Sequence, residues 1–218
     1  MKERPILFSA PMVRATLEGR KTQTRRVCKP MNKWVDQECR EVRTVNGEPF
    51  HFLKGATAPI EKLLCPYGQP GDKLWVRETA QHYKMPNFLT GEPTTADAGQ
   101  YCADGEPVLI DGGYDAAWWY SRPTCPAIHL PRWASRILLE VVSVRVERLQ
   151  DISEEDAEQE GISQDYADNA QMIAEAMNCQ EPDPFTSCFK ILWEDINGAK
   201  SWDANPWVWA IKFRVLKP

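Results

Sequence analysis

The chain has 218 residues, of which 43% are hydrophobic and 26% are charged, a composition typical of a folded domain and unlike that of a disordered chain. No run approaches the roughly 20 apolar residues of a membrane-spanning helix, and the opening MKERPILFSAPM lacks the apolar core of a secretory signal. We therefore expect a soluble, cytoplasmic protein with no membrane contact.

Charge is distributed unevenly along this acidic chain, whose formal net charge is -5. Residues 11–33 hold seven cations and one carboxylate, a net charge of +6, whereas residues 151–189 hold eleven carboxylates and no Lys or Arg. The asymmetry predicts a cationic site for an anionic ligand, beside an acidic segment that covers it or repels other polyanions. Two separately solvated surfaces are the alternative.

The first predicted helix spans residues 9–19, SAPMVRATLEG. Ser9 is a suitable N-cap, Pro11 is tolerated in a first turn, and Gly19 is a good stop. KTQTRRV, residues 21–27, then has the β-branched, alternating character of a strand or an extended loop. The basic cluster is therefore expected at the exit of a helix.

Three later segments read as strands: KLWVRE at 73–78, ILLEVVSVRVERL at 137–149 and NPWVWAIKFRVL at 205–216. In the last of these, Trp207 and Trp209 share the more apolar face, which we assign to the core. Because helices do not alternate regularly with these strands, we expect a small barrel or a strongly bent sheet.

The segment DISEEDAEQEGI, residues 151–162, predicts another helix, with Ser153 as its N-cap and Gly161 at its end. Carboxylates in its first turn are favourable, but Glu160 in the last turn faces the negative end of the helix dipole, at a cost of up to about one kcal/mol. A nearby cation is one explanation for a carboxylate in that place.

Three stretches between the strands, about 31–64, 84–128 and 163–200, read as insertions without an obvious core of their own. In the second, the consecutive aromatics Trp118, Trp119 and Tyr120 would form either a base-stacking surface or packing contacts.

The seven cysteines are odd in number and irregularly spaced, which predicts reduced thiols and no disulfide framework. Cys28, Cys39, His51 and Cys65 would surround zinc in principle, but no close Cys-x-x-Cys pair anchors them, so we expect no metal. His51, His82 and His129 have no nucleophile or metal partner at a recognisable spacing, and we take them as structural.

Four residues of the basic stretch match a known signature. Gly19, Lys21, Thr24 and Arg26 fit Gly-x-Lys, then a Thr or Glu three residues after the lysine, then an Arg two residues further on. In this respect the chain resembles the ASCH domains, which belong to the PUA-like β-barrels and are associated with RNA-related functions.

Two further matches extend the resemblance. GRKTQTRR and SEEDAEQEG are similar to the GRKTxTxR stretch and the T-E-x-x-A-E-Q-E helix of bacterial 4-acetylcytidine amidohydrolases within this family. The strands GDKLWVRE and NPWVWAIKF look like those of larger, phage-associated ASCH proteins.

The resemblance implies a mixed α+β fold, a PUA-like small β-barrel of the ASCH type with flanking helices and sizeable insertions. It implies a single domain, residues 1–218. The core segments of this domain are expected at about 5–30, 65–80, 130–162 and 203–216.

For the site, the resemblance implies that Thr24 is the nucleophile, Lys21 the base that activates it, and Glu160 a proton shuttle or lysine orienter. It also implies that Arg26, with Arg20 and Gly19, contacts the ligand. The reaction would release an acyl group from an exocyclic amine, as in 4-acetylcytidine, with no metal or other cofactor.

Elementary chemistry sets two conditions on this site. A lysine removes the proton of a hydroxyl only if desolvation or neighbouring positive charge lowers its pKa. In a straight strand Lys21 and Thr24 would point to opposite faces, so their convergence requires a turn or bulge after Gly19.

Two other functions stay open. In the first, the protein is a non-catalytic module whose cleft binds RNA or a modified nucleotide. A pI near 5.4 weighs against the binding of long stretches of nucleic acid. The third reading is a phage accessory protein that acts through its insertions on another protein.

Overall fold

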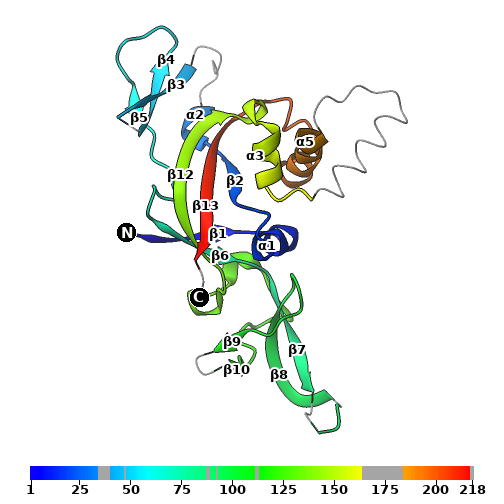
Figure 1. The fold of residues 1–218 in the computed structure, drawn as a ribbon. Helices are drawn as coiled ribbons and strands as arrows, with labels where there is room; N and C mark the ends of the chain where they lie inside the picture. The colour runs from blue at the N-terminus through cyan, green and yellow to red at the C-terminus, as the bar shows by residue number, and fades with distance from the viewer. Residues whose placement is uncertain are drawn as a thin grey trace, which may run out of the picture.

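Figure 1 shows the computed structural model of the chain, a mixed α+β, sheet-rich molecule built around one five-stranded sheet. The structure describes residues 1–33, 40–46, 48–86, 89–91, 93–110, 113–163 and 184–216. In their order across the sheet, the strands are β1 (Glu3–Leu7), β6 (Lys73–Arg77), β12 (Leu138–Arg148), β13 (Trp207–Leu216) and β2 (Gln23–Val27).

Few helices accompany the sheet. The α-helices are α1 (Ala10–Leu17), α2 (Lys29–Asn32), α3 (Glu154–Gln159) and α5 (Pro184–Asn197), and the 3-10 turns are η2 (Ala127–His129), η3 (Arg132–Ala134) and η4 (Leu149–Asp151). The structure places α1 between β1 and β2 along the chain, and α3 and α5 lie side by side next to β2 (Figure 1).

The central sheet is bent but open. β12 and β13 form its longest antiparallel ladder, with an irregularity between Val141 and Ser143, and β12 curves visibly along its length (Figure 1). Within the described residues the edge strands β1 and β2 form no ladder, so the predicted small barrel is not closed, whereas the predicted bend is observed. A side chain links the edges instead, because Nη2 of Arg26 donates to the carbonyl of Leu7 at 2.7 Å.

The last strand confirms the predicted alternation. Trp207 and Trp209 are buried in the main core, together with Ile211 and Phe213 of the same face. The opposite face is buried as well, because Val208 packs with α3 and α5 in a second cluster. β13 is thus a central strand covered on both sides.

The predicted helix ends are confirmed, with one difference. The side chain of Ser153 accepts a hydrogen bond from the amide of Asp156 at 3.2 Å, as expected of an N-cap. Ser9 occupies the N-cap position of α1 but makes no capping bond with its side chain. Gly19 and Gly161 follow α1 and α3 with φ of +78° and +98°, which explains why glycine stands at both places.

Three small sheets complete the structure. They consist of β3 (Arg40–Val45), β4 (Glu48–Leu53) and β5 (Glu61–Lys62); of β11 (Thr124–Cys125), β7 (Ala80–Pro86) and β8 (Pro93–Tyr101); and of β9 (Leu109–Ile110) with β10 (Tyr114–Asp115). The sheet of β7, β8 and β11 has a small core around Tyr101, Val108 and Leu130. Trp118, Trp119 and Tyr120 pack against that core, which supports packing over base stacking for these aromatics.

In the described part of the chain, which leaves out Cys39 and Cys179, no cysteine forms a disulfide. Among the same residues no three His, Cys, Asp or Glu side chains are grouped so that they would hold a metal ion. Of the helices that the structure describes, none has the length and apolar character needed to cross a membrane.

A substitution at Gly99 of β8 tests how Trp119 packs on this sheet. A Cβ at this position would lie 2.5 Å from Cζ3 of Trp119, so Gly99→Ala forces the indole ring aside. We expect a loss of about 1–3 kcal/mol in the free energy of unfolding, measured by chemical denaturation. In a Trp119→Ala background the same substitution should cost much less; an equal cost in both backgrounds would contradict this packing.

Candidate functional site

The turn after α1 shapes the candidate site. Gly19 takes a left-handed conformation, and the amide of Lys21 then donates back to the carbonyl of Ala15 at 2.9 Å. The chain thus folds against α1 before β2 begins at Gln23. The turn that the proposed convergence of Lys21 and Thr24 required is therefore present.

Lys21 and Glu160 form a buried ion pair. The Nζ atom of Lys21 lies 2.8 Å from Oε2 of Glu160 and 2.7 Å from its backbone carbonyl oxygen, and the two residues are 1% and 4% exposed. Glu160 is the C-cap of α3, where carbonyl groups lack partners within the helix. One ammonium group thus satisfies both the helix end and the carboxylate that local preference disfavours there.

Arg25 contacts the other carboxylate oxygen of Glu160. Nη1 of Arg25 lies 3.2 Å from Oε1 of Glu160, and its Nη2 donates to Glu147 at 2.6 Å and to Asp156 at 2.8 Å. The guanidinium group therefore joins α3, through its first turn and its C-cap, to β12. Its outer face lies over the ring of Phe189 of α5, 5.9 Å from the ring centroid.

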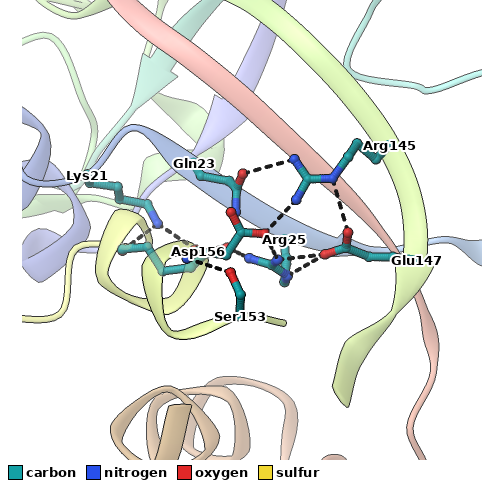
Figure 2. Close-up of polar contacts among 8 residues, drawn as sticks. Lys21, Gln23, Arg25, Arg145, Glu147, Ser153 and Asp156 are labelled. Carbon is teal, nitrogen blue, oxygen red and sulfur yellow. Dashed lines mark hydrogen bonds and ion pairs between the residues drawn. The ribbon is translucent and has the colours of Figure 1, made fainter. Parts of the chain in front are cut away.

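Arg145 of β12 completes the cluster. It donates to Asp156 at 2.5 Å and to Glu147 at 3.1 Å, and it contacts the side-chain oxygen of Gln23 at 3.4 Å (Figure 2). We call the six ionisable residues the Glu160 network: Lys21, Arg25, Arg145, Glu147, Asp156 and Glu160. It holds three cations and three carboxylates.

The Glu160 network decides between the alternatives for the uneven charge. Asp156 and Glu160 of the acidic segment pair with Lys21 and Arg25 of the basic segment. For these residues, two separately solvated surfaces are the wrong description. In these pairs, Asp156 and Glu160 cover and neutralise Lys21 and Arg25.

Burial and charge shift the pKa values of the network in different directions. Desolvation lowers the pKa of Lys21, and although Glu160 opposes this, the pKa stays below its ordinary value of 10.5. Burial by itself would lower the pKa of Arg25, but the surrounding carboxylates outweigh it and raise that pKa. The burial that raises the pKa of Asp156 is likewise outweighed, chiefly by Arg25, so that pKa is lowered.

Thr24 lies beside this network in the wall of a small cavity of about 50 Å³. Its side chain is buried, and Oγ1 has no hydrogen-bond partner among the described residues. Thr24 and Arg25 point to opposite faces of β2, but β2 is an edge strand, so both reach this cavity together with Glu160. The volume is sufficient for a few water molecules or a short acyl group.

Helix α5 forms the opposite, apolar wall of the cavity. Phe189, Leu192 and Trp193 contribute to this wall. Glu154 of α3 holds α5 in place, since its carboxylate accepts the backbone amides of Phe185 and Thr186 at 3.0 and 2.7 Å. A carboxylate at the start of a helix is also favourable to the helix dipole.

The structure separates the remaining predicted ligand contacts. Arg26 lines the cavity with Thr24, although its Nη2 is bonded to Leu7 and burial lowers its pKa. Arg20 is exposed, pairs with Glu18 and donates to the carbonyl of Gly161 at 2.5 Å. Arg20 and Gly19 do not line the cavity, and neither does Lys21, which is linked to it through Glu160.

Sequence reasoning missed part of the site. Asp156 lies four residues before Glu160, a spacing that places both on one helix face. Arg145 and Glu147 are two residues apart in β12, a spacing that places both on one face of the strand. These spacings were a usable signal. Nothing in the sequence pattern assigned Arg25 to Glu160.

Comparison with known proteins gave no match: no protein-family model, curated protein or solved structure is similar to this chain.

Gly161 tests the close approach of α3 to the lysine. A Cβ on Gly161 would lie 2.8 Å from Cβ of Ala15 and 3.1 Å from Cβ of Lys21, whereas a Cβ on Gly198, whose φ is similar, meets nothing within 4 Å. Gly198→Ala should cost only the backbone strain of about 1–2 kcal/mol. Gly161→Ala should exceed it by about 1–3 kcal/mol because of the added overlap. Equal losses in urea unfolding would show that this contact is unimportant.

Glu160 tests the buried network itself. Glu160→Gln leaves the cations of Lys21 and Arg25 without their shared carboxylate, and we expect it to lower the free energy of unfolding by about 3–5 kcal/mol. The matched control is Glu140→Gln, which breaks the more exposed pair with Arg214 and should cost less than about 1 kcal/mol. Similar losses for the two variants, measured by chemical denaturation, would rule out this role of the network.

Proposed function

We propose that the chain is an ASCH-type, PUA-like protein that hydrolyses the acyl amide of a modified nucleoside such as 4-acetylcytidine. One observation carries the proposal: Glu160 holds the buried Lys21 and also lines the small cavity into whose wall the buried Thr24 hydroxyl is set, without a partner among the described residues. This is the grouping of nucleophile, base and orienting carboxylate that amide hydrolysis requires.

The finer fold assignment belongs to the same proposal. A bent five-stranded sheet, with the signature residues Gly19 and Lys21 at the exit of the helix between its two edge strands, supports a PUA-like arrangement. In this chain the sheet stays open between β1 and β2.

The proposed reaction proceeds in two steps. Neutral Lys21 takes the proton of the Thr24 hydroxyl while the oxygen attacks the amide carbonyl, and the protonated lysine then gives this proton to the departing exocyclic amine. An ester of Thr24 remains. Water, activated by the same lysine, breaks the ester and releases the carboxylic acid and the free threonine.

The surroundings of Lys21 support its role as the base. Its lowered pKa increases the fraction of neutral amine near neutral pH. Glu160, itself fixed by Arg25, keeps the Nζ atom in place. The guanidinium group of Arg26 in the same wall supplies positive charge for the oxyanion of the intermediate.

The size of the cavity restricts how a substrate would bind. About 50 Å³ accommodates a short acyl group, and the apolar side chains of α5 suit its methyl end. The nucleoside itself would then lie outside the cavity.

A non-catalytic module for RNA or a modified nucleotide is the second candidate, and one observation favours it. Both acceptors of Nζ on Lys21 belong to Glu160, and this pairing stabilises the ammonium form that does not act as a base.

Activity with 4-acetylcytidine tests the proposal. The wild-type protein should release cytidine and acetate, whereas Thr24→Val and Lys21→Met should each lose about 10²–10⁴-fold in kcat. Thr24→Ser keeps a hydroxyl and serves as the matched control that retains measurable turnover. The rate should rise with pH through a pKa below 10.5, since only the neutral amine of Lys21 is active. Chromatography of the released nucleoside measures each rate.

Two results would contradict this assignment. Wild-type protein that releases no cytidine but binds RNA, with binding lost in Arg26→Ala, would favour the binding module. Turnover that persists in Thr24→Val would exclude Thr24 as the nucleophile.

A further inference from the structure

A second and larger cavity lies away from the Thr24 site, between the start of β1, the loop before β6 and the β4–β5 hairpin. Its volume is about 380 Å³, against about 50 Å³ beside Thr24. Val144 and Trp209 of the central sheet form part of its wall, as do Leu63 and Leu64. The volume falls in the range of small-molecule sites.

The carboxylates of this second cavity already have partners. Glu48 is paired with Lys62 at 2.5 Å. Asp72 accepts the backbone amides of Lys2 at 2.7 Å and Gln69 at 3.3 Å, and chiefly the first of these bonds lowers its pKa. Both acids thus have carboxylate oxygens that are already engaged by groups of the protein.

The cations opposite them are less well satisfied. Within the part of the chain that the structure describes, the buried Nε atom of Arg4 has no hydrogen-bond partner, and the side chains of Arg4 and Lys2 form no ion pair. Arg4 acts on Asp72 only through its charge. With Lys62 counted against Glu48, the cavity wall has an excess of positive charge.

Trp209 adds a further donor. The residue is 1% exposed, and its indole Nε1 has no acceptor among the described residues. A buried N–H without an acceptor costs free energy, and a bound acceptor removes that cost. Arg4 and Trp209, two residues of the cavity wall, thus each have a buried N–H group without an acceptor in the described part of the chain, next to an apolar surface.

We propose that this cavity binds a small organic anion, with a carboxylate or phosphate head group on Arg4 and Lys2 and a flat apolar body against Trp209 and Val144. A guanidinium group is suited to either head group, because both present paired oxygens that accept parallel hydrogen bonds. The site is independent of the amide hydrolysis proposed above, since it shares no lining residue with the Thr24 cavity.

Calorimetric titration with four probes tests the proposal. Benzoate and phenyl phosphate supply the two head groups on a flat ring, benzamide is the neutral counterpart, and inorganic phosphate lacks the ring. Benzoate or phenyl phosphate should bind at least about tenfold more tightly than benzamide or inorganic phosphate, the difference expected for one charge-assisted contact or one buried ring. The indole N–H resonance of Trp209, assigned with Trp209→Phe, should shift on binding.

Variants identify the head-group contact. Arg4→Gln should weaken binding by about tenfold or more, and Lys2→Gln by a smaller factor. The control Arg214→Gln, on the exposed end of β13, should leave the affinity unchanged. Thr24→Val should also leave it unchanged, which separates this test from that of the hydrolase. If Arg4→Gln does not fold, Lys2→Gln and the Trp209 resonance decide the question.

Three outcomes would overturn the proposal: wild-type protein that binds neither aromatic anion, benzamide that binds as tightly as benzoate, or folded Arg4→Gln protein with wild-type affinity.

Discussion

The buried ion pair between Lys21 and Glu160, extended by Arg25, is the interaction on which the arrangement of the site depends. Removing charged groups from water is costly, and the cost is offset only when nearly every donor and acceptor is paired. Here the lysine satisfies a helix end and a carboxylate oxygen, and the arginine reaches three acids. The turn after α1, the end of α3 and strand β12 are thereby held in one geometry.

This neutral network changes the meaning of the chain's basic segment. A cluster of cations suggests an open surface for polyanions. The most buried of these cations, Lys21 and Arg25, instead form ion pairs with carboxylates of the same chain. At the edge of the sheet they leave a small cavity, and the Thr24 hydroxyl in its wall has no partner among the residues that the structure describes. Unpaired donors lie instead around Arg4 and Trp209, at the other cavity. The two proposals, amide hydrolysis and anion binding, thus concern different places on one sheet.

Local rules predicted several elements correctly because the forces behind them act over a few residues. An N-cap serine, a positive-φ glycine at a helix end and the alternation of β13 depend on neighbours in the chain. Barrel closure does not depend on chain neighbours, because it requires pairing between strands that are distant in sequence. Here the side chain of Arg26 bonds to Leu7 where the edge strands would have to pair. The packing of Trp119 over Gly99 depends on tertiary contacts in the same way.

The sequence by itself determined which residues are unusual: a carboxylate at the unfavourable end of a helix, and a lysine and a threonine after a glycine turn. It also suggested a nearby cation as one explanation for Glu160 at that helix end. Only the tertiary structure decided that this cation is Lys21, 139 positions away, with Arg25 on the other oxygen. The reason is physical, since burial, and with it the strength of each charge interaction, is set by the packing of α3 and α5 against β2 and β13 rather than by sequence neighbours.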